Sequence, residues 1–221
     1  MSDCLLCGQS GANTTLREND YTYLKCANCG LYFVKPGERL SIEEEKRRYD
    51  FHENHPEDPK YRNFLSQLFD PVQKKLQRNK SGLDYGSGPG PTLHIMFEEA
   101  GHKMAHYDPI YNSDTSVFNQ TYDFITVSET AEHFYSPGEE FDKLWGLLRP
   151  NGILGVMTKL LTHPDHFDTW HYRKDDTHVA FYQPQTFEWI AHKYNADLEF
   201  YGDRVILLIK KNNMNSSNKS L

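Results

Sequence analysis

The sequence predicts an α/β protein with a doubly wound, mostly parallel β-sheet, preceded by a small cysteine-rich module. Three observations predict this. Short apolar strands alternate with helical stretches from residue 81 onwards, a glycine-rich turn follows the first strand, and all four cysteines lie in pairs near the amino terminus. With 221 residues, 38% hydrophobic and 14% aromatic, the chain can form one main domain with a packed core and one small module.

The amino-terminal module, residues 1–36, is identified by its cysteine spacing. Two Cys-x2-Cys pairs stand 18 residues apart, Cys4 with Cys7 and Cys26 with Cys29. Four thiolates at this spacing predict a tetrahedral, structural zinc site of the zinc-ribbon type. Two disulfides or a redox motif are the alternatives. The absence of an export signal and of a βαβ unit before residue 40 disfavours both. Substrate recognition, closure over a cofactor and homodimerisation all remain open as roles for the module.

A charged connector with helices is expected over residues 37–80. Ser41 and Glu44 form a capping-box pattern, which predicts a short helix over residues 42–49. An apolar stripe begins near residue 60, and Asp70-Pro71 predicts that it is divided into two helices or kinked.

The glycine-rich turn follows a short strand at residues 81–83 and points to a nucleoside-like ligand. An acid precedes three alternate glycines, and Pro91 follows them at a position suited to the first turn of a helix. Glycine allows a sharp turn and a close approach of the backbone to a ligand. The expected contacts are made by Asp84, Tyr85, Gly86, Ser87 and Gly88.

Three later segments continue the alternation of strands and helices. The first ends in Asp108-Pro109, where the carboxylate could accept hydrogen bonds from a ribose; a plain Asp-Pro turn is the alternative. The second is a strand that runs into Ser128-Glu129, ahead of a turn carrying His133. The third is a helix over residues 137–148, expected to break at Pro-Asn-Gly before another strand.

In this order, the four segments over residues 81–158 resemble class I S-adenosylmethionine-dependent methyltransferases. They are most similar to the quinone-biosynthesis O-methyltransferase branch, in which a Glu-x-x-Glu-His pattern follows the fourth strand, here Glu129 to His133. The resemblance implies a Rossmann-like sheet over residues 81–210 that ends in an antiparallel hairpin. It also implies S-adenosylmethionine as cofactor, held by the glycine turn together with Asp108, Pro109, Ser128 and Glu129. The adenine contact stays unassigned among Asp114, Asn119 and Gln120.

Residues 159–182 carry four histidines and several aromatic residues without a helical or strand period, which predicts a substrate lid. Trp170, Tyr172 and Asp175 are the candidate substrate contacts, with plain packing as the alternative for the two aromatic residues. A hydroxyl acceptor must lose a proton, and the two candidate bases are His133 and His178. The alternative for each histidine is packing or capping.

The sequence therefore predicts a methyltransferase that acts on a small or medium-sized acceptor at oxygen, with carbon and nitrogen as the alternative acceptor atoms. The alternatives are a methyltransferase acting on RNA or protein, with the zinc ribbon recognising the substrate, and a noncatalytic cofactor-binding interaction protein. A net charge of −7 disfavours nucleic acid as a partner. No membrane span or export signal is apparent, which predicts a cytoplasmic protein, and residues 211–221 have the composition of a disordered tail.

Overall fold

The computed structural model describes residues 2–18, 20–50 and 55–212. Part of the predicted connector, residues 51–54, lies outside these ranges. So does most of the predicted disordered tail, from residue 213 onwards.

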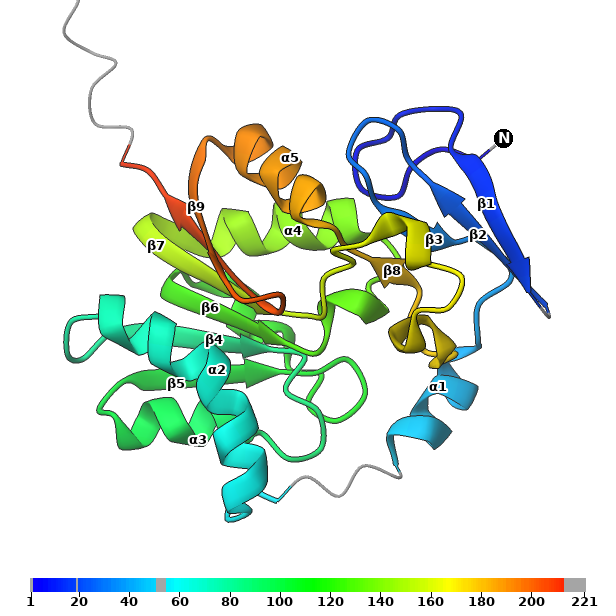
Figure 1. The fold of residues 1–221 in the computed structure, drawn as a ribbon. Coiled ribbons are helices and arrows are strands. Elements are labelled where there is room, and N and C mark those ends of the chain that lie inside the picture. Colours follow the sequence, from blue (N-terminus) through cyan, green and yellow to red (C-terminus); the bar gives the residue numbers. More distant parts are fainter. Residues whose placement is uncertain (1, 19, 51–54, 213–221) are drawn as a thin grey trace, which may run out of the picture.

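A six-stranded mixed sheet forms the centre of the molecule, in the order β5-β4-β6-β7-β10-β9 (Figure 1). The first four strands are parallel, whereas β10 pairs antiparallel with both β7 and β9. This arrangement confirms the predicted α/β sheet with its closing hairpin. The bounds are β4 (Ser81–Tyr85), β5 (Lys103–Tyr107), β6 (Tyr122–Ser128), β7 (Leu148–Met157), β9 (Ala196–Tyr201) and β10 (Val205–Lys210).

Two helices cover each face of this sheet (Figure 1). Helices α2 (Pro59–Lys75) and α3 (Thr92–Glu99) pack on one face, and α4 (Pro137–Leu147) and α5 (Pro184–Tyr194) on the other. Both faces of the inner strands are therefore buried, which explains their continuous apolar runs.

Of the two alternatives expected at Asp70-Pro71, the division into two helices is wrong, because the pair lies inside the single helix α2, whose N-cap is Asp58. Leu68 and Val72 on either side of the proline are fully buried, and their packing outweighs the lost backbone hydrogen bond. The Pro-Asn-Gly run of residues 150–152 lies within β7 and not before it. Asn151 takes a positive φ there, and the pairing with β6 shifts register.

A second, four-stranded sheet has the order β1-β2-β3-β8. Strands β1 (Asn13–Glu18), β2 (Tyr21–Lys25) and β3 (Tyr32–Val34) come from the cysteine-rich module. Strand β8 (Ala180–Phe181) comes from the expected lid and pairs antiparallel with β3. The sheet of the predicted zinc ribbon is thus completed by a segment about 150 residues further along the chain.

The expected lid, residues 159–182, is more regular than its sequence predicts. It contains two short 3-10 helices, η3 (Pro164–His166) and η4 (His171–Lys174), in addition to β8. Its buried Phe167 and Phe181 pack against Tyr23 and Tyr32 of the cysteine-rich module. A two-residue strand is too short to show a period, so the sequence pattern could not reveal it.

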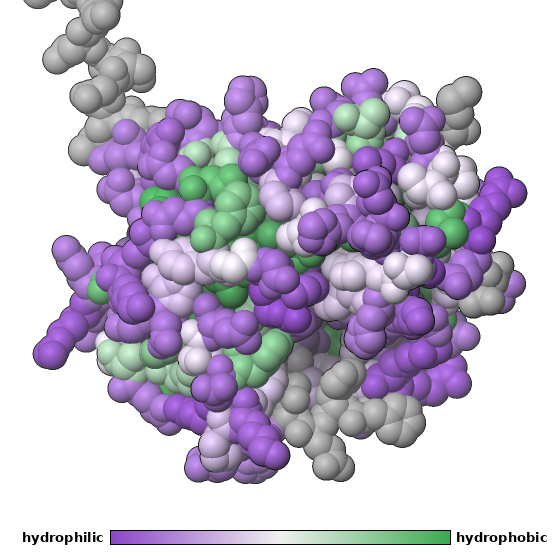
Figure 2. Space-filling model, in the orientation of Figure 1, coloured by the Kyte–Doolittle hydropathy of each residue, from purple (hydrophilic) through white to green (hydrophobic). Residues whose placement is uncertain are grey.

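Helix α1 (Ile42–Tyr49) has the predicted capping box between Ser41 and Glu44. It lies near the carboxyl ends of β4 and β6, beside the η4–β8 segment (Figure 1). Further 3-10 turns are η1 (Thr115–Asn119) and η2 (Ala131–His133). Among the described residues, no helix is both long and apolar enough to span a membrane. Hydrophilic residues dominate the face shown in Figure 2.

Candidate active site

The glycine turn leaves β4 with its backbone in the left-handed region. Gly86 has φ +77° and Gly88 φ +64°. A Cβ on Gly86 would lie 2.1 Å from Cγ2 of Thr130, so only glycine fits there. No heavy atom lies within 4 Å of the position of a Cβ on Gly88, and the buried hydroxyl of Ser87 has no partner among the described residues. The turn thus presents open space and an unsatisfied polar atom, as a ligand-binding loop requires.

Asp84, the acid before the turn, is only 3% exposed. It accepts hydrogen bonds from Oγ1 of Thr126, at 2.9 Å, and from the backbone N–H of His94. Burial raises the pKa of Asp84 to about 6, although both hydrogen bonds oppose this shift. Its carboxyl group therefore joins β6 and the start of α3 to the glycine turn.

Asp108 lies at the end of β5 and connects the second predicted motif to the first. Its carboxylate accepts the backbone N–H of Gly88 at 2.9 Å, and those of Ile110 and Tyr111 at 2.9 and 3.0 Å. Each carboxylate oxygen has two lone pairs, so the oxygen bound to Gly88 can accept one more donor, such as a ribose hydroxyl. Pro109 is exposed beside it in the turn.

The side chain of Tyr85 does not belong to this site. Successive residues of a strand face opposite sides of the sheet, so Tyr85 points away from the side that Asp84 faces. Its ring stacks on Tyr107, with centroids 5.2 Å apart, and its hydroxyl donates to Glu140 of α4. Only the backbone of Tyr85 can contribute to cofactor binding.

Ser128 and Glu129 lie where β6 ends. The carbonyl of Ser128 accepts a hydrogen bond from Oγ1 of Thr130, which also donates to the carbonyl of Gly86. Glu129 has φ +46°, a strained value for a residue other than glycine, and both its carboxylate oxygens lie 3.0 Å from Arg204. Burial and the nearby charge of Glu132 raise the pKa of Glu129 to about 7, against the opposing effect of Arg204.

The two predicted base candidates, His133 and His178, lie side by side with ring centroids 4.9 Å apart. Nδ1 of His133 is 2.9 Å from the carbonyl of Thr177, and Nδ1 of His178 is 2.7 Å from the carbonyl of Tyr172. A carbonyl can only accept, so each Nδ1 carries a proton and each neutral ring keeps its lone pair on Nε2. Burial lowers the pKa of His133, which keeps this imidazole neutral near pH 7.

Glu132 and Tyr172 complete a histidine cluster with His133 and His178. Glu132 is 1% exposed, and one of its carboxylate oxygens accepts the hydroxyl of Tyr172 at 2.5 Å. The ring of Tyr172 lies 4.3 Å from that of His178. The predicted substrate contact Tyr172 therefore holds Glu132 and His178 in place.

The other two predicted substrate contacts take supporting positions. Trp170 packs against Phe181 and Tyr172 at centroid distances of 6.0 and 5.2 Å. Asp175 accepts the N–H and hydroxyl of Thr177 and lies 3.9 Å from Nε2 of His178. Of the residues considered for the adenine contact, Asp114 caps η1.

Several residues of the site were not predicted from the sequence. Glu132 could have been found, since it stands in the Glu-x-x-Glu-His pattern. Thr130 and Arg204 carry no sequence signal. Neither does Tyr49 of α1, whose hydroxyl lies 2.9 Å from Nδ1 of His133 and donates to Glu45.

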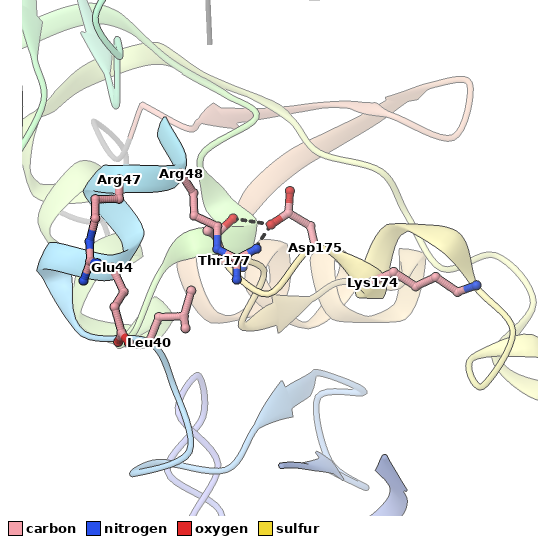
Figure 3. Close-up of a pocket in the computed structure, with 7 residues that line it drawn as sticks. All are labelled: Leu40, Glu44, Arg47, Arg48, Lys174, Asp175 and Thr177. Atoms are coloured by element: carbon pink, nitrogen blue, oxygen red, sulfur yellow. Dashed lines mark hydrogen bonds between the residues drawn. The ribbon is translucent and has the colours of Figure 1, made fainter. Parts of the chain in front are cut away.

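A cavity of about 670 Å³ lies beside the histidine cluster, between α1 and the η4–β8 segment (Figure 3). This volume is in the range of sites for small organic ligands. The cavity is lined by Leu40 and Glu44, by the cations Arg47, Arg48 and Lys174, and by Asp175 and Thr177, which lie next to His178.

The four cysteines gather at one point, with their sulfur atoms within 4.8 Å of one another. Sγ of Cys4 lies 3.5 Å from that of Cys29, and the same distance separates Cys7 and Cys26. Tetrahedral zinc–thiolate sites have bonds of about 2.3 Å and therefore similar sulfur–sulfur spacings. The four thiolates fit one tetrahedral zinc ion, and together they would fill all four of its coordination positions.

A doubly wound sheet with a glycine turn and paired acids at its carboxyl edge defines a nucleoside-cofactor enzyme. Residues 54–199, well over half the chain, match the methyltransferase domain family. The chain belongs to this family and is an S-adenosylmethionine-dependent methyltransferase.

Solved structures share the fold at low sequence identity. The chain is similar to DesVI of Streptomyces venezuelae (TM-score 0.53, 10% identity, 78% of this chain and 99% of that one). It is also similar to phosphoethanolamine N-methyltransferase 2 of Haemonchus contortus, with a TM-score of 0.52 and 12% identity. That match covers 68% of this chain and 53% of the other. A third similar structure is the 1,6-didemethyltoxoflavin N1-methyltransferase of Burkholderia thailandensis, with a TM-score of 0.50 and 13% identity. That match covers 91% of this chain and 100% of the other. No curated protein matches the chain significantly.

Proposed function

We propose that this methyltransferase methylates an oxygen atom of a small or medium-sized acceptor, with an imidazole of the histidine cluster as base. The observation that carries the proposal is the fixed tautomer of His133 and His178. Each ring donates Nδ1–H to a backbone carbonyl and keeps a lone pair on Nε2. A hydroxyl acceptor needs such a proton acceptor, because it becomes a good nucleophile only as it loses its proton.

In this proposal, one group of residues binds the cofactor and another group binds and activates the acceptor. S-adenosylmethionine supplies a methyl group on a positively charged sulfur. On the cofactor side, Asp108 is placed to accept a ribose hydroxyl, and the turn at Gly86 and Gly88 allows close approach. On the acceptor side, the proton passes from the acceptor hydroxyl to Nε2 of His133 or His178. Holding acceptor and methyl group in line is the chain's other contribution, worth several kcal/mol of the barrier.

The proposal extends to the cysteine-rich module, which we infer to be a zinc ribbon that supports the acceptor side. The N–H of Val34 in β3 donates to the carbonyl of Val179, and the N–H of Val179 donates to the carbonyl of Glu132. A metal-folded module would thereby hold the backbone on both sides of the histidine cluster. Thiols that bind zinc need a reducing environment, which supports a cytoplasmic location.

The size of the acceptor is supported by the cavity of about 670 Å³ next to the cluster. The names of two similar structures, the toxoflavin-pathway and phosphoethanolamine enzymes, also describe methyltransferases of small molecules. Both are N-methyltransferases, so a nitrogen acceptor is the outcome that would contradict the proposal.

The test is an acceptor screen with methyl-labelled cofactor, followed by assignment of the methylated atom in the product by NMR. We expect an O-methyl product. Of the two single variants His133→Gln and His178→Gln, the one that removes the base should lower kcat by about 10²-fold or more, and the double variant should lose at least as much. His166→Gln, an exposed histidine of the same segment, is the matched control and should leave kcat unchanged.

The pH profile separates a base from a packing residue. Since burial lowers the pKa of His133, kcat should hold its plateau to a lower pH than a solvent-exposed imidazole would allow, and fall below it as the ring takes up a proton. A nitrogen- or carbon-methylated product, or a double variant with unchanged kcat, would refute the proposal.

A further inference from the structure

The cavity beside the histidine cluster has a charge opposite to that of the whole chain. Three cations line it, Arg47 and Arg48 of α1 and Lys174 of η4, together with only two acids, Glu44 and Asp175 (Figure 3). The chain as a whole has a net charge of −7. A hollow that gathers positive charge on an acidic protein attracts anions, because its low-dielectric walls concentrate the field.

Both acids of the cavity wall are held by neutral hydrogen-bond donors. Glu44 accepts the backbone N–H and the hydroxyl of Ser41, each at 2.9 Å, in the capping box of α1. Asp175 accepts the N–H and the hydroxyl of Thr177 at 3.0 and 2.6 Å. Neither acid forms an ion pair with a lining cation within the part of the chain that the structure describes. The carboxylates therefore leave these cations available.

Two of the three lining cations have no carboxylate partner among residues 2–18, 20–50 and 55–212. Nε of Arg47 donates only to the backbone carbonyl of Glu43, at 3.2 Å. Lys174 extends away from α1 in Figure 3, and its exposed, flexible side chain can turn toward an anion in the cavity. Arg48 differs from both, because it pairs with Asp176.

Arg39, which precedes the lining residue Leu40, adds a further positive charge behind the cavity wall. Its guanidinium donates to the carbonyls of Tyr135 and Val34, at 2.7 and 3.4 Å, and its buried Nε has no partner in the described ranges. The hydroxyl of Tyr135 donates to the carbonyl of Leu40 at 2.8 Å, which ties this arginine to the wall. Burial lowers the pKa of Arg39. An anion in the cavity would offset part of the cost of this buried charge.

The cavity and the histidine cluster share a wall. Thr177 lines the cavity, and its carbonyl lies 2.9 Å from Nδ1 of His133. Asp175, on the same wall, lies 3.9 Å from Nε2 of His178. A small molecule held in the cavity can therefore reach the imidazoles with its other end.

We propose that the methyl acceptor carries an anionic oxygen group, a carboxylate or a phosphate, which Arg47 and Lys174 bind in this cavity. The assignment rests on the proposed function, which places the acceptor beside the histidine cluster. A guanidinium binds either anion through paired N–H groups, and an ammonium adds a mobile point charge. The bound anion orients the acceptor, so that its hydroxyl reaches Nε2 of His133 or His178.

The test measures the binding of three probes to the full-length protein by titration, without methyl transfer. The probes are benzoate, phenyl phosphate and the neutral benzyl alcohol, and S-adenosylhomocysteine is present to fill the cofactor site. Each anion should bind at least about tenfold more tightly than benzyl alcohol. Raising NaCl from about 0.05 M to about 0.5 M should weaken the binding of the anions alone. The comparison of benzoate with phenyl phosphate decides which anion the cavity prefers.

Substitution of the two available cations separates a built site from general attraction. Arg47→Gln combined with Lys174→Met should weaken both anions at least about tenfold and leave benzyl alcohol unchanged. Arg47→Lys, which keeps the charge, should retain most of the affinity. Arg78→Gln, before β4, and Lys103→Met, at the start of β5, are exposed at the opposite edge of the sheet. They are the matched controls and should bind as the wild type does.

Each outcome decides one of the two proposals. Equal affinity for benzoate and benzyl alcohol, no binding of either anion up to millimolar concentration, or anion binding that survives the double substitution overturns the anion site. Thermal unfolding shows that the variants, changed only at exposed positions, remain folded. Anion binding together with a nitrogen-methylated product refutes only the O-methylation, while O-methylation of a neutral acceptor by a protein that binds neither anion refutes only the anion site.

Discussion

The proposed cofactor side and the proposed acceptor side differ in how far apart in the sequence their residues lie. On the cofactor side, Asp84, Gly86 and Gly88 come from one short run, and Asp108 follows the next strand of the same α/β unit. On the acceptor side, Tyr49, Glu132 and His178 come from three distant segments, held by a sheet that reaches back to Val34.

This difference shows why the fold carries a constant cofactor and a variable acceptor. Parallel strands place every strand end at the same edge, so the cofactor side forms from the α/β unit itself. The acceptor side depends on what is added around that edge, here α1, the η4–β8 segment and the cysteine-rich module.

Cys29 is a fully buried thiol. Replacing it should disrupt the proposed acceptor side and leave cofactor binding intact. Cys29→Ser should abolish zinc binding, release β8 from β3, and lower the free energy of unfolding by about 3 kcal/mol or more. We expect acceptor turnover to fall below detection while the Kd for S-adenosylmethionine, measured by calorimetry, changes little. Thr14→Ala on exposed β1 is the control. Equal loss of cofactor binding would show that the two sides fold as one unit.

Replacing Gly86 should have the opposite effect. Gly86→Ala forces a side chain into the left-handed region and against Thr130, which should cost about 2–5 kcal/mol through backbone strain and overpacking. Calorimetry should show a large loss of cofactor affinity, with zinc content unchanged. Gly146→Ala in α4, where nothing lies within 4 Å, is the matched control and should bind the cofactor normally. Normal cofactor affinity in Gly86→Ala would contradict the role assigned to the turn.

The pH dependence of stability should report on buried Asp84. Its pKa rises from 3.8 to about 6 in the folded protein, so the folded state binds this proton more tightly than the unfolded chain does. The free energy of unfolding should therefore fall as pH rises from about 4 to about 6, by up to about 3 kcal/mol. Denaturant unfolding of wild type and Asp84→Asn across this range isolates the effect as their difference. A difference that does not vary with pH would mean that Asp84 is not buried as described.

The smallest effect is expected where the two added segments meet at the surface. Arg48 of α1 pairs with Asp176 at 2.8 Å, with side chains 49% and 37% exposed. Arg48→Ala should change the free energy of unfolding by less than about 1 kcal/mol, because exposed pairs contribute little. Thermal unfolding checks the stability, and the KM for the acceptor is measured on the same variant. A KM that rises while stability holds would place α1 in the acceptor site.

The sequence alone determined what depends on neighbouring residues. The capping box of α1, the glycine turn and the acid at the end of β5 all follow from local spacing, and the structure has each of them. The closing hairpin was implied by the family resemblance, and the structure has it as well. The cluster of four cysteines was equally readable, because their paired spacing predicted the close group of sulfur atoms that the structure has. Where tertiary packing outweighed a local preference, at Pro71 in α2 and at Asn151 in β7, the sequence pattern was misleading.

The construction of the proposed acceptor side could not be read from the sequence. A two-residue strand such as β8 has no period to read, and the pairing of Phe181 with Tyr32 depends on a fold that brings distant segments together. The direction of a side chain at a strand end also depends on the sheet, which is why the side chain of Tyr85 faces Glu140 of α4 and not the predicted site. Glu132 lies in η2, where its contact with Tyr172 depends on the long-range packing of the η4–β8 segment. Turns, caps and metal-ligand spacings depend on adjacent residues and can be predicted from them. Contacts across long loops form only when the packing of the whole chain offsets the entropy lost in closing those loops.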